Sequence, residues 1–391
     1  LPYPRIQSIA VLPLENLSRD PEQEYFADGM TEELITNLGK IRALRVISRT
    51  SVMRYKGTKK SLPEIARELN VDALVEGTVL RSGERVRITA NLLHAPTDRH
   101  LWAESYERDV RDVLALQSEV ARAIAEEVRI KLTPQEQVRL TATSPVNPEA
   151  YEAYLKGRHY WNLWPGGLEP SVEYFQEAIK QDPRYAPAYA GLSICYSSMG
   201  YFQPPKEVYP KARAVALRAL ELDETLAEAH TAIGFVKLNF DWDWHGAERA
   251  WRRALELNPN SVEALRLATE QLIWPGQLEE GLTQARRARD LDPLSRHVNL
   301  WLGYAYMRTR HYDEAIAQYR TILELHPTFV GARSHLECVY TFKGMYAEAL
   351  AELKKQGWVG DDPMDSFLYA RMGRRDDARR NRFHASSSSS G

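Results

Sequence analysis

Residues 303–327, GYAYMRTRHYDEAIAQYRTILELHP, contain the pattern that decides the fold of this 391-residue chain. Three kinds of residue in this stretch recur along the chain in steps of 34. The small series is Ala247, Gly281, Ala315 and Ala349, the bulky or apolar series is Trp251, Ala285, Tyr319 and Leu353, and the prolines are Pro259, Pro293 and Pro327. Because small residues let helices approach and proline ends them, the pattern predicts a repeated helix pair.

This period and this pattern resemble those of the tetratricopeptide repeat. The resemblance implies an all-α right-handed superhelix of stacked helix pairs, whose concave inner surface binds other molecules. We expect about six repeats and a partial one over residues 148–383, after a linker at 136–147. Residues 384–391 are low in complexity and are interpreted as a disordered tail or a cloning scar.

The composition is typical of a soluble globular protein, with 44% hydrophobic and 27% charged residues. The formal net charge of −2 gives no general reason to bind nucleic acid, and no apolar run is long enough to span a membrane. Cys195 and Cys338 fall in different predicted repeats, so they are interpreted as buried apolar side chains rather than as a disulfide. The chain begins at Leu1 without a signal-peptide pattern and is expected to be an excised piece or a mature product.

The first 132 residues have a different pattern, in which short apolar runs alternate with helical periods. The sequence predicts strands at 8–14, 44–47, 73–80, 85–93 and 101–106, and helices at 26–41, 61–69 and 112–132. Ser61 and Glu64 form a capping box at the start of the second helix. In the strand at 85–93 apolar residues alternate with polar ones, so one face of the sheet should be buried and the other wet. This order predicts an α/β or α+β layer.

Five strings in this part resemble, in order, the TolB-like amino-terminal domain: SIAVLPLENLSRDPEQEYFADGMTEELITNLGKI, LRVISRTSVMRYKG, VDALVEGTVLRSGERVRITANLL, HLWAESYERD and ALQSEVARAI. The resemblance covers nearly all of residues 5–132, and we assign residues 1–135 to such a domain. It implies a non-catalytic mixed α/β domain that precedes tetratricopeptide repeats in bacterial proteins. In those proteins a Ser/Thr kinase, an adenylate cyclase or a winged-helix regulator lies upstream, often before a membrane helix that would anchor this part. The resemblance therefore favours the periplasmic face of the inner membrane, with the cytoplasm as the alternative.

No motif anchors an enzymatic reaction, because GxxxxGK[ST], GxGxxG, GxSxG and HExxH are all absent from the sequence. The carboxylates Asp28, Glu32 and Glu33 are interpreted as an acidic helix start that the helix dipole favours. His94, His100 and Glu104 are interpreted as solvated groups around one hairpin end. We therefore predict no catalytic, cofactor-binding or metal-binding residue. An enzyme would need a metal or nucleotide bound between the two domains.

Candidate binding residues lie on the predicted inner face of the first helix of each repeat. Tyrosine, tryptophan and arginine dominate this row, and they are the types that contribute most to binding hot spots. The row consists of Tyr154, Arg158, Trp161, Asn162, Tyr189, Tyr196, Phe235, Asn239, Arg266, Trp274, Tyr304, Met307, Arg308 and Phe342. It predicts capture of an extended peptide or a partner helix, although each aromatic could instead pack between repeats. The Lys and Asn clamp of chaperone-binding repeats is lacking, so chaperone tails are not expected as ligands.

Two further clusters have structural interpretations. Trp242 and Trp244, and the stretch from Trp161 to Trp164, are expected to cap helix ends in the core rather than stack on a ligand. The arginine run that starts at Arg371 is expected to form a solvated terminal helix. The sequence as a whole predicts a non-enzymatic protein-interaction or sensory module of a bacterial signalling protein. The alternative is a stand-alone scaffold subunit of a larger complex.

Overall fold

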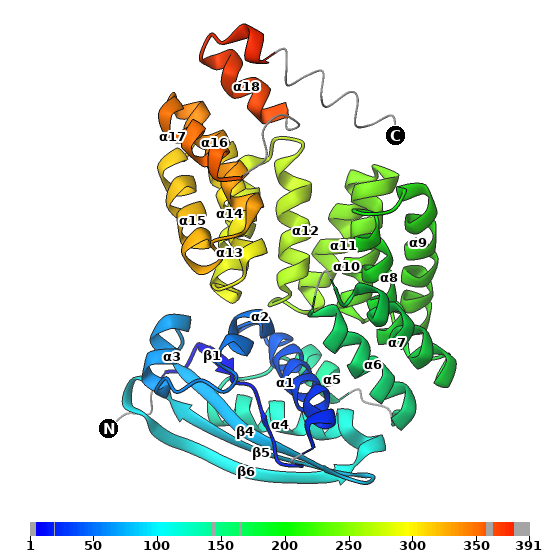
Figure 1. Ribbon diagram of the computed structural model, residues 1–391. Helices are drawn as coiled ribbons and strands as arrows, with labels where there is room; N and C mark the ends of the chain where they lie inside the picture. Colours follow the sequence, from blue (N-terminus) through cyan, green and yellow to red (C-terminus); the bar gives the residue numbers. More distant parts are fainter. Residues whose placement is uncertain (1–4, 19, 142–144, 164–165, 357–362, 379–391) are drawn as a thin grey trace. The chain divides into compact units, whose positions relative to one another are not determined.

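The computed structural model describes residues 5–18, 20–141, 145–163, 166–356 and 363–378 (Figure 1). The chain forms two compact units. The first comprises Leu1–Gln271 together with Asp290–Asp292, and the second comprises Leu272–Arg289 together with Pro293–Gly391. The predicted combination of a sheet region followed by helical repeats is confirmed, and the two units are described separately below.

The first unit begins with a mixed sheet in the strand order β3-β1-β4-β5-β6. The strands are β1 (Ser8–Val11), β2 (Glu15–Asn16), β3 (Arg45–Val46), β4 (Ala73–Ser82), β5 (Arg85–His94) and β6 (Arg99–Asp109). β1 runs parallel to β3 and β4, β2 pairs parallel with β4, and β4, β5 and β6 are antiparallel. The predicted alternation in β5 is confirmed, because Val86, Ile88, Ala90 and Leu92 are buried while Arg85 and Arg87 are exposed.

Five α-helices accompany the sheet in the described residues: α1 (Glu24–Gly39), α2 (Arg49–Val52), α3 (Leu62–Leu69), α4 (Val113–Glu127) and α5 (Pro134–Thr141). α1 and α4 lie beside the sheet (Figure 1). The core that they share with the strands contains Phe26, Met30 and Leu34. The capping box of Ser61 and Glu64 at the start of α3 is confirmed. The helix expected to reach residue 132 ends instead at Glu127, because the chain turns there and Arg129 has a φ of 58°.

The segment expected to be a linker, 136–147, is helical in its first part. Residues up to Thr141 belong to α5, whose Leu140 is fully buried. The Glu136 carboxylate accepts the backbone N–H of Arg42 at 2.8 Å, and Val146 donates its N–H to the Arg111 carbonyl at 2.9 Å. These contacts tie the segment to the sheet region. The limits proposed for the sheet domain, linker and array remain predictions.

Helix pairs follow in the first unit. They are α6 (Pro148–Trp161) with α7 (Leu168–Gln181), α8 (Ala186–Met199) with α9 (Pro205–Leu222), and α10 (Ala227–Val236) with α11 (Trp244–Leu257). α10 continues as a π-helical turn at Lys237–Asp241, and α12 (Val262–Ile273) begins the next pair. One hydrophobic core runs from Ile6 in the sheet region to Cys195 in α8, so the sheet and the first repeats are packed as one body.

The second unit continues the repeat pattern. Its helices are α13 (Leu278–Leu291), α14 (Arg296–Arg308), α15 (Tyr312–Leu325), α16 (Val330–Lys343), α17 (Tyr346–Gln356) and α18 (Pro363–Arg371). Tyr319 is fully buried, and its ring lies where a side chain at Gly303 would have to fit. The interpretation of the cysteines is confirmed, because Cys195 and Cys338 are both buried and do not form a disulfide. Each described helix is too short or too polar to span a bilayer.

Gly157 tests whether the small positions of the repeat serve close packing. A Cβ at Gly157 would lie 2.7 Å from Cδ1 of Phe175, whose ring is almost fully buried. We expect Gly157→Ala to lower the free energy of unfolding by about 1–3 kcal/mol, despite the better helix propensity of alanine. Urea denaturation measures the change. Gly166→Ala is the control, because a Cβ there would face open space. Equal stability of the two variants would contradict this account of the repeat.

Candidate functional site

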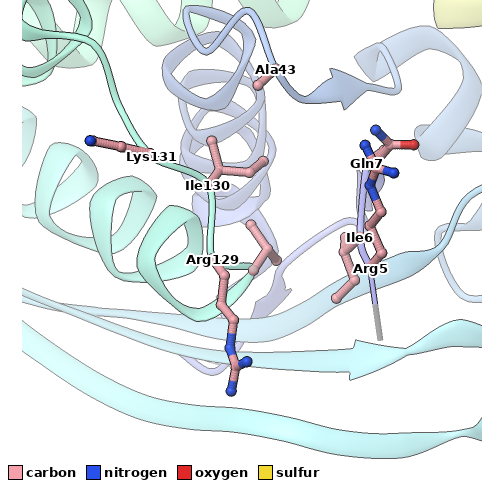
Figure 2. A pocket seen from close by; sticks show the side chains of 8 residues that line it. Arg5, Ile6, Gln7, Ala43, Arg129, Ile130 and Lys131 are labelled. Atoms are coloured by element: carbon pink, nitrogen blue, oxygen red, sulfur yellow. The ribbon is translucent and has the colours of Figure 1, made fainter. Parts of the chain in front are cut away.

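A pocket of about 380 Å³ lies between the start of the chain and the end of α4 (Figure 2). Its lining includes the cationic side chains of Arg5, Arg129 and Lys131. The charged ends of Arg129 and Lys131 point away from each other, so these cations do not converge on one anion (Figure 2). In the described parts of the chain no group of His, Cys, Asp and Glu side chains could hold a metal ion.

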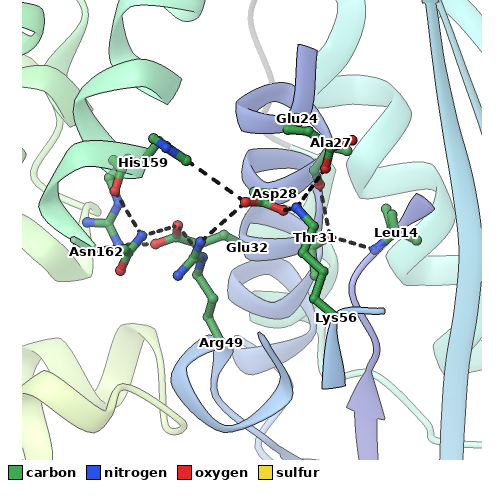
Figure 3. Close-up of polar contacts among 11 residues, drawn as sticks. Leu14, Glu24, Ala27, Asp28, Thr31, Glu32, Arg49, Lys56, His159 and Asn162 are labelled. Carbon is green, nitrogen blue, oxygen red and sulfur yellow. Dashed lines mark hydrogen bonds and ion pairs between the residues drawn. The ribbon is translucent and has the colours of Figure 1, made fainter. Parts of the chain in front are cut away.

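The inner face of the first repeat is covered by a helix of the same chain. Tyr154 on α6 donates its hydroxyl hydrogen bond to Glu33 of α1 at 3.3 Å. One turn further along α6, the Arg158 guanidinium donates to the Glu32 carboxylate, and Asn162 Nδ2 approaches the same carboxylate at 3.4 Å (Figure 3). Three predicted groove residues therefore lie together as expected, but what they bind is α1.

α2 and the residues after it complete the charge pairing around α1. Arg49 Nε lies 3.3 Å from Glu32 Oε2, and its Nη2 lies 3.9 Å from Asp28 Oδ2. Lys56 Nζ reaches Asp28 Oδ1 at 2.5 Å, while His159 Nδ1 on α6 lies 3.9 Å from Asp28 Oδ2 (Figure 3). Carboxylates from α1 thus meet cations from both neighbours, which offsets the cost of removing these charges from water.

Apolar contacts beside this network bring α1 and α6 close together. A Cβ at Gly29 would lie only 2.7 Å from Leu155 Cδ2, so the two helices approach as closely as a glycine allows. The rings of Phe26 and Tyr151 meet edge to face, with their centroids 6.5 Å apart. Such pairs are worth about 0.5–1.5 kcal/mol beyond their buried area. The α1–α6 contact is therefore an ordered part of the core.

Later repeats within the first unit also bond to the sheet region. Asn260, after α11, donates to the carbonyls of Gly39 and Leu44 at 2.9 and 3.0 Å and accepts the N–H of Val46 at 3.1 Å. Ser51 Oγ donates to Asp292 Oδ1 at 2.6 Å. These bonds hold the sheet region against turns that follow the third and fourth helix pairs.

The structure overturns the interpretation of Asp28, Glu32 and Glu33 as an acidic helix start. α1 begins at Glu24, so these three residues lie beyond its first turn. Their carboxylates contact side chains of α6 instead of the free N–H groups at the start of α1. Burial by itself would raise the pKa of Glu32, but Arg158 and Arg49 bring that pKa below its usual value. Burial lowers the pKa of His159, while Asp28 acts in the opposite direction. The sequence analysis did not identify Arg49, Lys56 and His159 as partners of these carboxylates. The presence of carboxylates among the apolar residues of α1 could have indicated that cationic partners were needed.

Most other groove candidates in the first unit have partners nearby. Tyr189 donates its hydroxyl to the Pro183 carbonyl at 3.1 Å, and Tyr196 accepts Gln176 Nε2 at 3.0 Å. Trp161 packs partly buried against the core. These three residues make contacts within the repeats, as expected for residues that stabilise the array.

Phe235, Asn239 and Arg266 form a second small cluster. Phe235 is buried, and the Arg266 guanidinium lies 4.3 Å from the centroid of its ring. Arg266 Nη1 also lies 3.4 Å from Glu270 Oε2. Asn239 donates to the Phe235 carbonyl at 3.1 Å. Here too the predicted residues are largely used in internal contacts.

The candidates in the second unit are more accessible. The Trp274 side chain is 52% exposed and that of Phe342 is 43% exposed. Trp274 lies 6.3 Å from Tyr304 between ring centroids, and Arg308 Nη1 donates to the Tyr304 hydroxyl at 3.0 Å. Met307 is mostly buried. Trp274 and Phe342 are exposed while Tyr304 and Arg308 are partly exposed, and we call these four residues the distal row.

The structure contradicts part of the interpretation of the tryptophan cluster and agrees with that of the arginine cluster. Trp242 is 69% exposed in a left-handed turn, so its interpretation as a core cap is wrong, whereas Trp244 is partly buried. Arg374 pairs with Asp377 at 2.8 Å, as expected for a solvated helix. Trp164 and Arg379, Arg380 and Arg382 lie outside the described residues.

Comparison with known proteins agrees with the repeat pattern. The sequence model of the tetratricopeptide repeat family matches residues 298–329. The matched residues comprise most of α14 and the whole of α15, so the family model supports the repeat assignment for this helix pair. The human IFIT1 dimer with m7Gppp-AAAA is similar in structure, with a TM-score of 0.51 and 14% identity over 70% of this chain and 64% of that chain. At this identity the likeness concerns the fold alone.

Two curated relatives are similar in sequence. "Putative adenylate cyclase 3" of Rhizobium meliloti (strain 1021) is 35% identical over 313 residues, which are 80% of this chain and 42% of that protein. Hsp70-Hsp90 organizing protein 2 of Arabidopsis thaliana is 28% identical over 95 residues, 24% of this chain and 15% of that protein. The chain thus spans less than half the length of these relatives. The expected lack of chaperone-tail binding remains a prediction.

Arg158 tests the strength of the α1–α6 contact. We expect Arg158→Met to lower the free energy of unfolding by about 3 kcal/mol, because Glu32 stays in the interface and loses one of its guanidinium partners. Arg87→Met, in the exposed pair with Glu107, should cost at most about 1 kcal/mol. Denaturant titration measures both changes. A loss for Arg158→Met as small as that for Arg87→Met would show that the contact contributes little.

Proposed function

We propose that this chain is a non-enzymatic protein-interaction module whose free inner face, the distal row, binds a segment of a partner protein. The observation that carries the proposal is α1 lying on the inner face of the first repeat. It supplies an example, within this chain, of a helix bound through tyrosine, arginine and asparagine side chains. Helix-in-groove binding of this kind is a recurrent mode of recognition.

The distal row has the composition of a binding hot spot. Trp274, Tyr304, Arg308 and Phe342 combine large rings with one guanidinium, and two of the rings are about half exposed. Aromatic and arginine side chains of this kind contribute most of the binding energy at protein interfaces. In this proposal Tyr154, Arg158 and Asn162 serve the internal contact with α1, and the distal row serves the partner.

The signalling context rests on the cyclase-named relative and on the resemblance of the first 132 residues to TolB-like domains. The relative extends well beyond the matched region, so a catalytic activity in its name can reside in the part that this chain does not match. We propose that the α/β region belongs to the TolB-like family and connects the repeats with an upstream effector. The chain itself lacks the common phosphate, nucleophile and zinc motifs, which supports a binding role for this segment.

The test is affinity capture from lysate of the source organism, followed by titration calorimetry with the partner recovered. The bait is the full chain, and the variant is Trp274→Ala, Arg308→Ala and Phe342→Ala together. We expect the dissociation constant of the partner to rise at least about tenfold, because each truncation removes a hot-spot side chain. Circular dichroism checks that the variant is folded.

A matched variant changes exposed residues on the second helix of the fifth repeat. Thr321, Glu324 and Leu325 are exposed on α15, and their combined replacement by alanine should leave the affinity unchanged. Equal weakening by both variants, or none by either, would place the contact outside the distal row. Recovery of an intact multi-subunit complex would favour the scaffold alternative.

A further inference from the structure

Glu33 differs from the other carboxylates at the α1–α6 contact in the groups around it. Asp28 and Glu32 lie within ion-pairing distance of Arg49, Lys56 or Arg158, whereas the hydrogen bond to Glu33 comes from the neutral hydroxyl of Tyr154 at 3.3 Å. Glu33 therefore has much weaker support for its charged form than its neighbours have.

The charged groups whose fields act on Glu33 come from several helices. On α1 they are Glu32 and Lys40, on α6 Arg158, and on α10 Glu228. The negative charge of Glu33 also contributes to raising the pKa of three nearby tyrosines, Tyr151, Tyr154 and Tyr185. Two like charges thus oppose the ionisation of Glu33, and the cations around it are already engaged, since Arg158 pairs with Glu32 and Lys40 bonds to Asn37.

We propose that Glu33 is a pH-sensitive latch between the sheet region and the repeat array. With its carboxyl group protonated, α1 packs tightly on α6. With the group ionised, an unpaired charge remains in the contact and is repelled by the charges of Glu32 and Glu228. The contact between α1 and the inner face of the array then opens more often.

The direction of the pH dependence follows from the pKa of Glu33. Burial, with the nearby carboxylates Glu32 and Glu228 adding to it, raises this pKa from 4.5 to about 7. The closed contact therefore binds the proton more tightly than the open one. Its stability is greatest below the ordinary pKa, falls as the pH rises towards 7, and levels off above that value.

His159 acts with the opposite sign over part of this range. Its pKa is lowered by burial, so the closed contact loses stability as the pH falls below the ordinary histidine value of 6.5. Glu32, whose pKa is lowered, contributes a loss only in stronger acid. The pH dependence of the wild-type chain therefore combines the contributions of these three groups. A Glu33 variant is needed to separate the contribution of Glu33 from the other two.

The test compares hydrogen exchange of the α1 and α6 amides in the wild-type chain and in Glu33→Gln between pH 5 and pH 8.5. At each pH the ratio of the two exchange rates removes the intrinsic pH dependence of exchange. We expect α1 and α6 of Glu33→Gln to exchange at least about tenfold more slowly than wild type above pH 7, and the difference to shrink several-fold by pH 5. A ratio that does not change with pH would overturn the proposal.

Two further variants secure the interpretation. Glu149→Gln makes the same chemical change at an exposed position near the start of α6, and its exchange should follow wild type at every pH. Glu228→Gln removes one negative charge that raises the pKa of Glu33. At a given pH above the ordinary carboxyl pKa, we expect the α1 and α6 amides of this variant to exchange more slowly than those of the wild-type chain. If Glu33→Gln did not fold, the absence of any shift in Glu228→Gln would by itself overturn the latch.

Discussion

The structure of the first unit depends on the pairing of carboxylates that α1 carries into the interior. Charges removed from water are costly unless opposite charges and hydrogen bonds meet them. Arg49 in α2 and Arg158 in α6 both meet Glu32, so three helices from distant parts of the sequence must keep one arrangement. The sheet region and the first repeats consequently share one core, and the inner face of the first repeat is filled from within the chain.

The candidate inner-face residues differ in their surroundings between the two units. Near the start of the array, tyrosine and arginine side chains contribute to intramolecular order. In the second unit, similar side chains remain accessible on a helical framework that Tyr319 and its neighbours stabilise. The same recognition chemistry can thus hold a domain in one repeat and be offered to another protein elsewhere.

The sequence predicted what depends on local periodicity. Gly157 and Gly191 both face the ring of Phe175, and Gly303 faces Tyr319, so each of these three glycines has a packing partner at a short distance along the chain. The β5 alternation likewise reflects one buried face. Docking of α1 leaves no such trace, because Glu32 and Arg158 are 126 residues apart and neither shows its partner by spacing. The three candidates Tyr154, Arg158 and Asn162 do lie together, but periodicity could not show that they contact α1.

The long-range bonds also bear on the order in which the molecule can fold. Ser51 and Asp292, which bond directly, are separated by 241 residues, and closing so long a loop is slow compared with forming one helix pair. During synthesis the sheet region emerges first, yet Glu32 and Asp28 lack Arg158 and His159 until the first repeat has followed. Native packing of the amino-terminal region is therefore completed only after the repeats have been made. Truncation after the sheet would leave Phe26, Gly29 and the α1 carboxylates exposed, with a corresponding risk of aggregation.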